Sequence, residues 1–452
     1  MSEPLPVRSI VQAALIVSLV AGGYSGNQAL YALSALLAVA STLMEWPRLL
    51  PLARLFSTLA VVLGLMITAF LPQQLPQLWH ALVQGVSFAA LMMVLGMLRR
   101  PVRRSAFVRQ GTEYLFTFEP RQRYAAVNIG SHLLSLLFNV GIIAMIGDLA
   151  RAGGRDAVAR RPLVLGAMRG AALTSIWSPI GLGFAIVTAG IPSLDPLKLM
   201  GISFALTAVM LLLTSAFPLL PAEASHGVSR PVVGEAPSAR PLAITIGICG
   251  LLLSITITLH LLTGISFTLA SVTVLPIFTL IWLALETGVG PAYVAEVKGA
   301  VVGLGDLRSE STIFLSANVI GASISIALGA IPGWVDFVQS QVPVLPLLLT
   351  ALILIPVAAA CFIPNSIFVV ILAQLLGQSP IGTAHPLALG VTLSVAWASA
   401  VAVSPISAMS LVTASQSDVS PQRVAWRWNT AFTTIVLVVT IIAICGLMWL
   451  GL

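Results

Sequence analysis

Apolar segments of about twenty residues recur along the whole chain and limit its fold more than any other feature. A helix of that length crosses the hydrocarbon core of a bilayer, which is roughly 30 Å thick. Hydrophobic residues make up 58% of the 452 residues and charged residues only 8%, which excludes an ordinary soluble domain. The segments are continuously apolar rather than alternating, which excludes a membrane β-barrel. We therefore expect an all-α polytopic membrane protein embedded in the lipid bilayer.

The apolar segments predict about eleven transmembrane helices and two re-entrant hairpins. The helices are expected at 9–24, 28–46, 51–71, 77–98, 161–190, 197–220, 241–261, 267–286, 310–330, 384–414 and 428–451. The hairpins are expected at 124–149 and 343–377. Each hairpin is an apolar stretch that enters and leaves the membrane on the same side.

A polar segment rich in Pro, Ala and Ser, 221–240, has the composition of a linker and divides the chain. It separates a first repeat (28–220) from a second repeat (241–452), and an extra N-terminal helix (1–27) precedes both. Each repeat then has five helices and one hairpin. The linker is expected on the cytoplasmic side.

One set of polar and helix-breaking residues occurs twice in the same order. The first copy is Asn139, Pro162-Leu163-Val164-Leu165-Gly166 and Ser178-Pro179-Ile180. The second copy is Asn365, Pro386-Leu387-Ala388-Leu389-Gly390 and Ser404-Pro405-Ile406. The spacings are 23 against 21 residues from Asn to Pro, and 16 against 18 from Pro to Ser. Such a duplication in an apolar chain is typical of a repeat-built secondary transporter.

The distribution of arginine and lysine predicts how the two repeats are oriented. Arginines flank the first hairpin on both sides, whereas the flanks of the second hairpin, 331–342 and 378–385, contain no Lys or Arg. Because cytoplasmic loops are enriched in basic residues, the first hairpin should open to the cytoplasm and the second to the outside. The remaining basic loops fit a cytoplasmic N-terminus and an external C-terminus. The repeats should therefore be inverted relative to each other.

The paired asparagines are candidate binding residues at the hairpin tips. A chain reversal inside the membrane leaves backbone groups without helical partners, and lipid cannot satisfy them. Asn139 and Asn365 offer both a donor and an acceptor there, and Ser366 adds a hydroxyl. The alternative is a simple hydrogen bond between helices for each asparagine. Their paired positions favour a binding role.

The two Ser-Pro pairs are candidate helix breaks. Ser178-Pro179 and Ser404-Pro405 each lie in the middle of a long apolar segment, where proline removes a helical hydrogen bond. A broken helix directs its positive and negative ends at one site, which suits an anion and a cation. Nearby hydroxyls add polar groups: Thr174, Ser175, Ser399 and Ser407. A proline kink without a binding role is the alternative at each position.

Arg169 is the one charged residue clearly inside an apolar segment. A buried arginine is costly in a membrane, so it is a candidate to attract an anionic substrate or to pair with Asp148. It also lies only eight residues beyond Arg161, so its side chain could extend to the cytoplasmic surface instead. The second repeat has Leu393 near the equivalent place. Both interpretations of Arg169 stay open at this point.

The whole pattern resembles the ion transporter superfamily, and most closely the architecture of the divalent anion:sodium symporters. In that family, hairpin tips carry Ser-Asn-Thr and the broken helices carry Thr-Pro-Pro, and the resemblance implies a homodimer that alternates access to one central site. Here the tips read Phe138-Asn139-Val140 and Pro364-Asn365-Ser366, and the breaks read Ser-Pro-Ile. The chain therefore resembles a divergent member of the superfamily.

The sequence thus predicts a secondary transporter in the cytoplasmic (inner) membrane, coupling a small organic anion to sodium or protons. We expect no cofactor apart from sodium as the coupling ion. The cysteines and histidines show no spacing that is typical of a metal site. The basic residues lie at membrane borders, which argues against a nucleic-acid partner. Alternatives are the membrane subunit of a TRAP-type carrier, or an enzyme acting on lipid-linked substrates. A channel is disfavoured by the broken repeats, and an ATP-driven pump by the missing P-loop.

Overall fold

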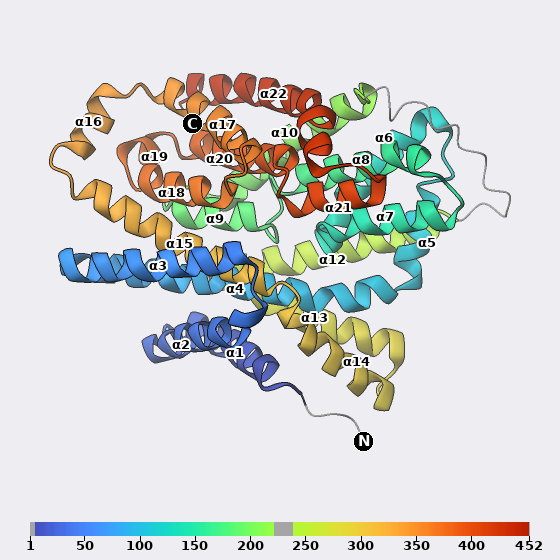
Figure 1. The fold of residues 1–452 in the computed structure, drawn as a ribbon, viewed down its shortest axis with the longest axis horizontal. Coiled ribbons are helices and arrows are strands. Elements are labelled where there is room, and N and C mark those ends of the chain that lie inside the picture. Colours follow the sequence, from blue (N-terminus) through green and yellow to red (C-terminus); the bar gives the residue numbers. More distant parts are fainter. Residues whose placement is uncertain (1–4, 221–237, 452) are drawn as a thin grey trace. The chain divides into compact units, whose positions relative to one another are not determined.

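The computed structural model describes residues 5–220 and 238–451, and every regular element in these ranges is a helix (Figure 1). In this part of the chain, ten helical segments are long and apolar enough to cross a membrane. The eleventh predicted helix, 161–190, is divided into two shorter helices at its expected break. The chain is an all-α multi-pass membrane protein, as the sequence predicted. The segment 221–237 of the predicted linker lies outside the described residues.

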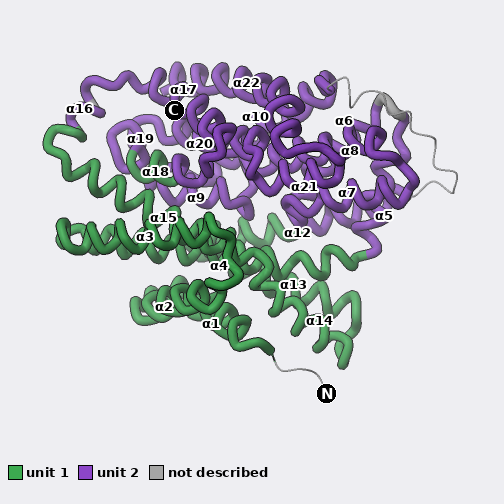
Figure 2. Tube along the Cα trace, viewed as in Figure 1, with its two compact units in different colours: residues 1–105, 251–335, 370–375 green, residues 106–250, 336–369, 376–452 purple. Residues whose placement is uncertain are grey.

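The chain forms two compact units, and each is described by itself (Figure 2). Unit 1 comprises residues 1–105, 251–335 and 370–375. Its helices are α1 (Val7–Ser25), α2 (Gln28–Glu45), η1 (Trp46–Arg48), α3 (Pro51–Phe70), η2 (Pro72–Gln74), α4 (Leu75–Arg104), α13 (Phe267–Thr287), α14 (Pro291–Val302), η3 (Gly303–Gly305) and α15 (Arg308–Gly329). The packing is reciprocal, because α3 packs on α15 and α13 packs on α4, while α4 and α15 pack on each other.

A glycine permits the close approach of α4 and α15. A Cβ on Gly85 would lie 2.9 Å from the backbone oxygen of Leu315. Further along α4, a Cβ on Gly96 would meet the backbone oxygen of Gly303 at 2.4 Å. Small residues at such crossings let helix backbones come together in a membrane, where no water drives them together.

Unit 2 comprises residues 106–250, 336–369 and 376–452. Its helices are α5 (Ala106–Tyr114), α6 (Pro120–Phe138), α7 (Gly141–Ala152), α8 (Ala157–Thr174), α9 (Leu182–Gly190), α10 (Pro196–Ala216), α17 (Val344–Ala360), α19 (Pro380–Ala384), α20 (Pro386–Val403), α21 (Ala408–Ser417), η4 (Arg423–Trp428) and α22 (Thr430–Trp449). Three further helices, α12 (Arg240–Thr263), α16 (Trp334–Gln341) and α18 (Asn365–Gly377), contribute residues to both units.

Packing within unit 2 also occurs in matching pairs. The first hairpin arm α6 packs on α8 and α10, and the corresponding arm α17 packs on α20 and α22. In the same way, α8 packs on α21 and α9 packs on α20. Each half of the sequence therefore provides the same kinds of element to unit 2, in the same order and with corresponding neighbours.

Both expected hairpins are pairs of helices. In the first, α6 ends at Phe138 and α7 begins at Gly141, and Asn139 has a positive φ of 47° at the reversal. In the second, residues 361–364 join α17 to α18, and Phe362 has a φ of 65°. These are left-handed backbone conformations that non-glycine residues adopt mainly at sharp turns. That the hairpins re-enter the membrane on one side stays a prediction.

Several elements differ from the sequence-based expectation, among them the short helices α16 and α19 in the flanks of the second hairpin. The segment between 286 and 310, expected as a loop, contains α14, which begins at Pro291 where proline suits the first helical turn. Another unexpected helix, α5, lies in the polar stretch before the first hairpin. The helix α8 begins at Ala157 rather than near Pro162, because the Asp156 side chain accepts a hydrogen bond from the Ala159 amide at 2.8 Å and caps it.

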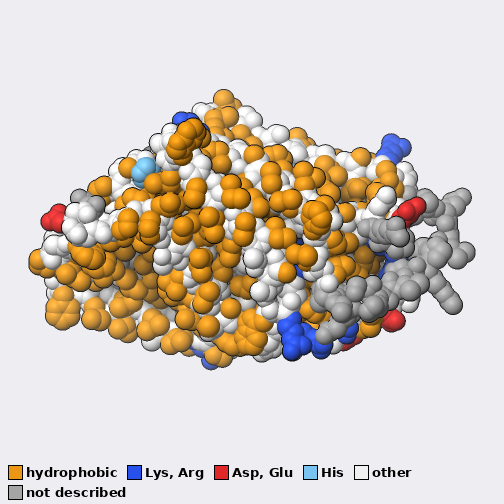
Figure 3. Space-filling model, turned by 90° about the horizontal axis from the view of Figure 1, so that it is seen from above, with side chains coloured by type: hydrophobic (Ala, Val, Ile, Leu, Met, Phe, Trp, Pro, Cys, Tyr) orange, Lys and Arg blue, Asp and Glu red, His pale blue; other side chains and the backbone are white. Residues whose placement is uncertain are grey.

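Large apolar side chains cover much of the surface. Examples with more than three-fifths of their area exposed are Leu36 on α2 and Val61 on α3 in unit 1, and Leu212 on α10 and Ile442 on α22 in unit 2. Figure 3 shows hydrophobic side chains over most of one face of the molecule, with the visible Lys and Arg gathered in a few places. Such surfaces are suited to lipid and not to water.

Candidate functional site

The first helix break lies in unit 2 at the first Ser-Pro pair. After α8 ends at Thr174, the backbone makes tighter turns, in which the Ser175 amide bonds to the Ala172 oxygen at 3.2 Å and the Ile176 amide to the Leu173 oxygen at 3.3 Å. Helical structure resumes only at Leu182, where α9 begins. Pro179 has no amide hydrogen to continue the helix, so the break follows from the sequence. Ser178 is buried within this break.

The second break lies between α20 and α21, at residues 404–407. Ser404 is buried, and its amide makes the last hydrogen bond of α20, to the Ala400 oxygen at 2.9 Å. Pro405 follows and interrupts the helix. Ser407 caps the next helix, because its Oγ accepts a hydrogen bond from the Ser410 amide at 3.1 Å. The predicted hydroxyl of Ser407 therefore has a structural partner in this conformation.

His132 connects the first hairpin to the first break, and the sequence did not single it out. Its Nδ1 lies 3.1 Å from the Gly170 backbone oxygen and 3.0 Å from the Thr174 hydroxyl. Its Nε2 accepts a hydrogen bond from the Trp177 indole at 3.2 Å. The ring is 3% exposed. Because Nε2 is an acceptor here, Nδ1 carries the proton, and the neutral imidazole links α6 to α8.

Thr174, a predicted site residue, belongs to the same network. Its hydroxyl donates to the His132 backbone oxygen at 2.7 Å, and the Ser135 hydroxyl lies 2.5 Å away. Gly170 permits the close approach of the two helices, since a Cβ at this position would lie only 2.1 Å from the Asn128 backbone oxygen. The end of α8 and the arm of the first hairpin are thereby held together. Ser175 instead bonds back to its own helix, at the Ala172 oxygen, at 2.7 Å.

Arg169 is buried in unit 2 with 1% of its area exposed, so it does not reach the surface. It does not pair with Asp148 either, which accepts a hydrogen bond from Gln416 at 3.0 Å. Its guanidinium donates four hydrogen bonds to neutral acceptors: the Tyr124 hydroxyl, the Asn429 side chain, and the backbone oxygens of Pro218 and Trp428. Arg169 forms no ion pair with a carboxylate of the described residues.

The Arg169 charge is also close to aromatic rings. Its guanidinium carbon lies 5.2 Å from the centre of the Phe432 ring and 6.0 Å from that of Tyr124. Ring faces attract cations, particularly where water is excluded. The positive charge is therefore solvated by neutral groups and is not cancelled by a counter-charge.

Several hydroxyls on α20 and α21 are buried and make no hydrogen bond with the described residues. Ser399 was predicted from the sequence, and four more share its situation: Ser394, Ser410, Thr413 and Ser417. The side-chain amide nitrogen of Asn365 is also without a hydrogen-bond partner in the described part of the chain. Buried polar groups normally have partners, so these are candidates to bind a small molecule or ion. Ser366, next to Asn365, is buried as well.

The structure does not join all the predicted residues into one hydrogen-bonded cluster. Asn139 is exposed at the tip of its hairpin, while Asn365 is half-buried in the first turn of α18. Within the described residues, no hydrogen bond links either asparagine side chain to a helix break. Thr174 and Ser178 lie on the first break, and Ser404, Pro405 and Ser407 on the second. The site stays a prediction.

Each hairpin exit crosses a broken helix from the other half of the sequence at a glycine. A Cβ on Gly147 of α7 would lie 2.4 Å from the Gln416 side-chain oxygen on α21. The counterpart is Gly377 at the end of α18, where a Cβ would lie 2.2 Å from the Gly190 backbone oxygen at the end of α9. The two crossings involve corresponding elements of the repeats.

The fold has a counterpart among solved structures. The chain is similar to the YdaH transporter of Alcanivorax borkumensis, whose crystal structure is described as having an unusual topology, with a TM-score of 0.54 and 15% sequence identity. The match covers 88% of this chain and 98% of that chain. No protein-family model and no curated protein matches the sequence. At this identity the likeness shows the fold alone, which is a membrane-transporter fold like that of YdaH.

Proposed function

We propose that this protein is a secondary active transporter that moves a small organic anion across the cytoplasmic (inner) membrane together with sodium or protons. The observation that carries the proposal is the pair of helix breaks, each accompanied by a hairpin and packed in reciprocal fashion within unit 2. Two repeats with broken helices at their centre suit alternating access to one site. The proposal places the chain as a divergent relative of the divalent anion:sodium symporters.

The reciprocal packing supports an inverted repeat. A two-fold relation between the repeats would produce the matching helix pairs that occur within each unit. It would also produce the two glycine crossings, at Gly147 and at Gly377. The arginine distribution favours opposite orientations of the two repeats, with the N-terminus inside and the C-terminus outside. We extend the superfamily resemblance to a homodimer.

An anion is favoured as substrate because Arg169 keeps its charge without a carboxylate partner among the described residues. Its field acts in surroundings that screen charge poorly, so it raises the local preference for an anion. The helices α9 and α21 begin directly after the breaks, and their N-terminal ends add partial positive charge. In this proposal Arg169 attracts the anion through its electrostatic field and not by direct contact, because its hydrogen-bond donors are used to hold α6, α8 and α22 together.

We propose that a sodium ion binds among the hydroxyls that have no hydrogen-bond partner in the described part of the chain. Ser399, Ser410 and Thr413 provide neutral oxygen atoms of the kind that bind hard cations such as sodium. His132 at the other break can take up a proton only at Nε2, which requires that the hydrogen bond from the Trp177 indole breaks. Coupling to sodium and coupling to protons therefore depend on different residues, so mutations can distinguish the two.

Cysteine accessibility tests the site without knowledge of the substrate. In a background with Cys249, Cys361 and Cys445 replaced by alanine, single cysteines at Asn139 and Asn365 are labelled from each side of oriented vesicles with a membrane-impermeant maleimide. Alternating access predicts that each position reacts, and that its rate from one side falls when its rate from the other side rises. If neither position reacts from either side, the assignment of the site is wrong.

A further inference from the structure

Unit 1 contains an apolar groove that the transport proposal does not use. The groove has a volume of about 640 Å³ and lies between α2, α3, α4 and α15. Along α3 its lining extends from Ser57 to Thr68, which is about 16 Å of helix at 1.5 Å per residue. Its walls include Val61, Leu65 and Leu82. A volume of this size is within the range of ligand sites, about 300–1,000 Å³.

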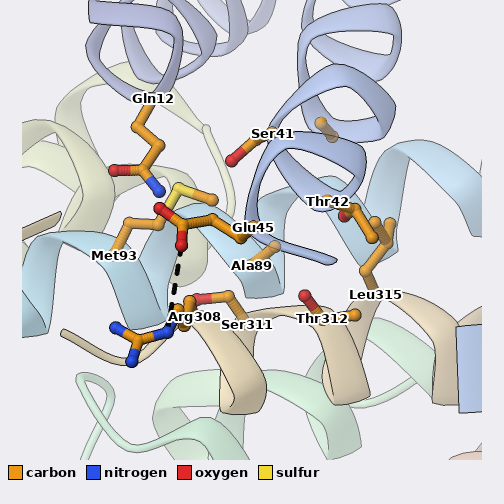
Figure 4. A pocket seen from close by; sticks show the side chains of 11 residues that line it. Gln12, Ser41, Thr42, Glu45, Ala89, Met93, Arg308, Ser311, Thr312 and Leu315 are labelled. Atoms are coloured by element: carbon orange, nitrogen blue, oxygen red, sulfur yellow. Dashed lines mark ion pairs between the residues drawn. The ribbon is translucent and has the colours of Figure 1, made fainter. Parts of the chain in front are cut away.

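A small polar pocket adjoins the groove, because Thr42 and Leu315 line both (Figure 4). The Glu45 side chain at the end of α2 lies in this pocket and is only 3% exposed. The atoms Glu45 Oε2, Gln12 Oε1 and Ser311 Oγ have no hydrogen-bond partner among the described residues. The pocket volume of about 10 Å³ has room for one water and not for a larger group.

Three arginines from separate elements converge on the Glu45 carboxylate. Arg8 Nε lies 3.5 Å from Oε1, while Arg48 Nη1 and Arg308 Nε lie 4.0 and 3.9 Å from Oε2. One negative charge therefore faces three positive charges, which leaves an excess of two. Arg48 is 53% exposed and Arg8 is 32% exposed, and neither guanidinium donates a hydrogen bond to another described residue.

The positive charge lies at one end of the apolar groove. Trp46 lines the groove, and Arg48 is two residues further along in the same short helix η1. Exposed apolar side chains flank this end, including Leu43 at 64% and Leu50 at 59%. The arginines are on the side of the membrane that their distribution assigns to the cytoplasm, where lipids carry negative charge.

We propose that unit 1 binds a phospholipid with an anionic headgroup, with an acyl chain in the groove and the phosphate at Arg8 and Arg48. Charge complementarity and an adjoining apolar channel are the two features that an anionic lipid needs, and a neutral lipid would leave the excess charge without a partner. Glu45 is a positioning residue whose carboxylate orients the two guanidiniums through its ion pairs. This inference does not depend on the transport activity.

Lipid binding to the delipidated full-length protein in detergent tests the headgroup site. The ligands are phosphatidylglycerol, phosphatidylcholine with the same acyl chains, and inorganic phosphate. Native mass spectrometry measures their binding, and thermal unfolding measures the stabilisation of the protein. Phosphatidylglycerol should bind and raise the unfolding midpoint. Binding should be about 30-fold weaker in the Arg8→Gln/Arg48→Gln double variant, since each arginine near a membrane surface contributes about 1 kcal/mol. Arg109→Gln, which changes a 63% exposed arginine on α5, should leave binding unchanged.

A second variant tests the groove and avoids a folding defect. A Cβ on Gly64 meets only Val319 Cγ1, at 4.0 Å, so Gly64→Leu fits the backbone and fills part of the groove. The matched control is Gly201→Leu on α10, where a Cβ meets nothing within 4 Å. Gly64→Leu should lose phosphatidylglycerol binding and Gly201→Leu should keep it.

Three results would overturn the lipid site. Equal binding of phosphatidylcholine would remove the role of the arginines. An equal stabilisation by inorganic phosphate would show a site for a free anion. A loss of dimer in Gly64→Leu, with lipid binding unchanged, would show that a second copy of the chain covers the groove.

Discussion

Replacing Arg169 with methionine should destabilise unit 2 strongly, because four acceptors lose their donor at once. These acceptors are the Tyr124 hydroxyl, the Asn429 side chain and two backbone oxygens, and the guanidinium that serves them is 1% exposed. A buried group left without its hydrogen bond costs about 1–3 kcal/mol. Even at the lower limit, four such groups cost about 4 kcal/mol, which is a large part of the stability of a typical domain.

Lysine at the same position separates the fold from the charge. Arg169→Lys keeps the positive charge and three donors, so it should lose only about 1–2 kcal/mol relative to the wild type. Thermal unfolding in detergent measures both variants, and the matched control Arg109→Met removes an exposed arginine from α5. If Arg169→Met unfolds within about 0.5 kcal/mol of the control, the four hydrogen bonds do not hold these helices together, and the reasoning fails.

Three further predictions concern other contacts of the two units. His132→Ala should lower stability by about 2–3 kcal/mol, because the Trp177 indole loses its acceptor and the Gly170 backbone oxygen loses the Nδ1 donor. An effect no larger than that of His80→Ala, at an exposed histidine on α4, would contradict this. Gly170→Ala should disrupt the contact between α6 and α8, whereas Gly201→Ala should be tolerated, and equal unfolding midpoints would count against the close approach. Burial raises the pKa of Glu296 on α14, but hydrogen bonds and charges from Arg100 and Arg104 outweigh it and hold the pKa below its ordinary value. A carboxyl whose pKa is lower in the folded than in the unfolded state stabilises the folded state at pH values above the unfolded pKa. The wild type should therefore be more stable than Glu296→Gln by its full amount at pH 7, and this difference in stability should disappear as the pH falls through the folded-state pKa. A difference that stays constant down to pH 3 would refute the ion pairs.

The helices and their breaks could be predicted because their causes are local. A continuous apolar stretch of twenty residues has to satisfy its own backbone in lipid, so the sequence fixes a helix there without reference to neighbours. Proline removes a donor wherever it occurs, so the break at Ser178-Pro179 lies where the sequence placed it. The extent of α8 was less predictable, because the cap at Asp156 competes with Pro162 as the starting point.

The contacts of the candidate site could not be predicted, because they join segments that are distant in the sequence. The sequence shows no cluster that includes His132, and only the fold brings this residue to Trp177 and Gly170. The partners of Arg169 come from α6, from the end of α10 and from the junction before α22. One sequence signal was available for Glu45: it is an acidic residue beside Arg48 at a membrane border.

The central claim is that the protein couples the movement of an organic anion to an ion gradient. Uptake of a panel of radiolabelled carboxylates into proteoliposomes, with the sodium gradient and the pH gradient imposed separately, measures this most directly. We expect accumulation of at least one anion against its own gradient when one of the two ion gradients is present, and none when both are dissipated. Flux that is independent of both gradients would contradict the account.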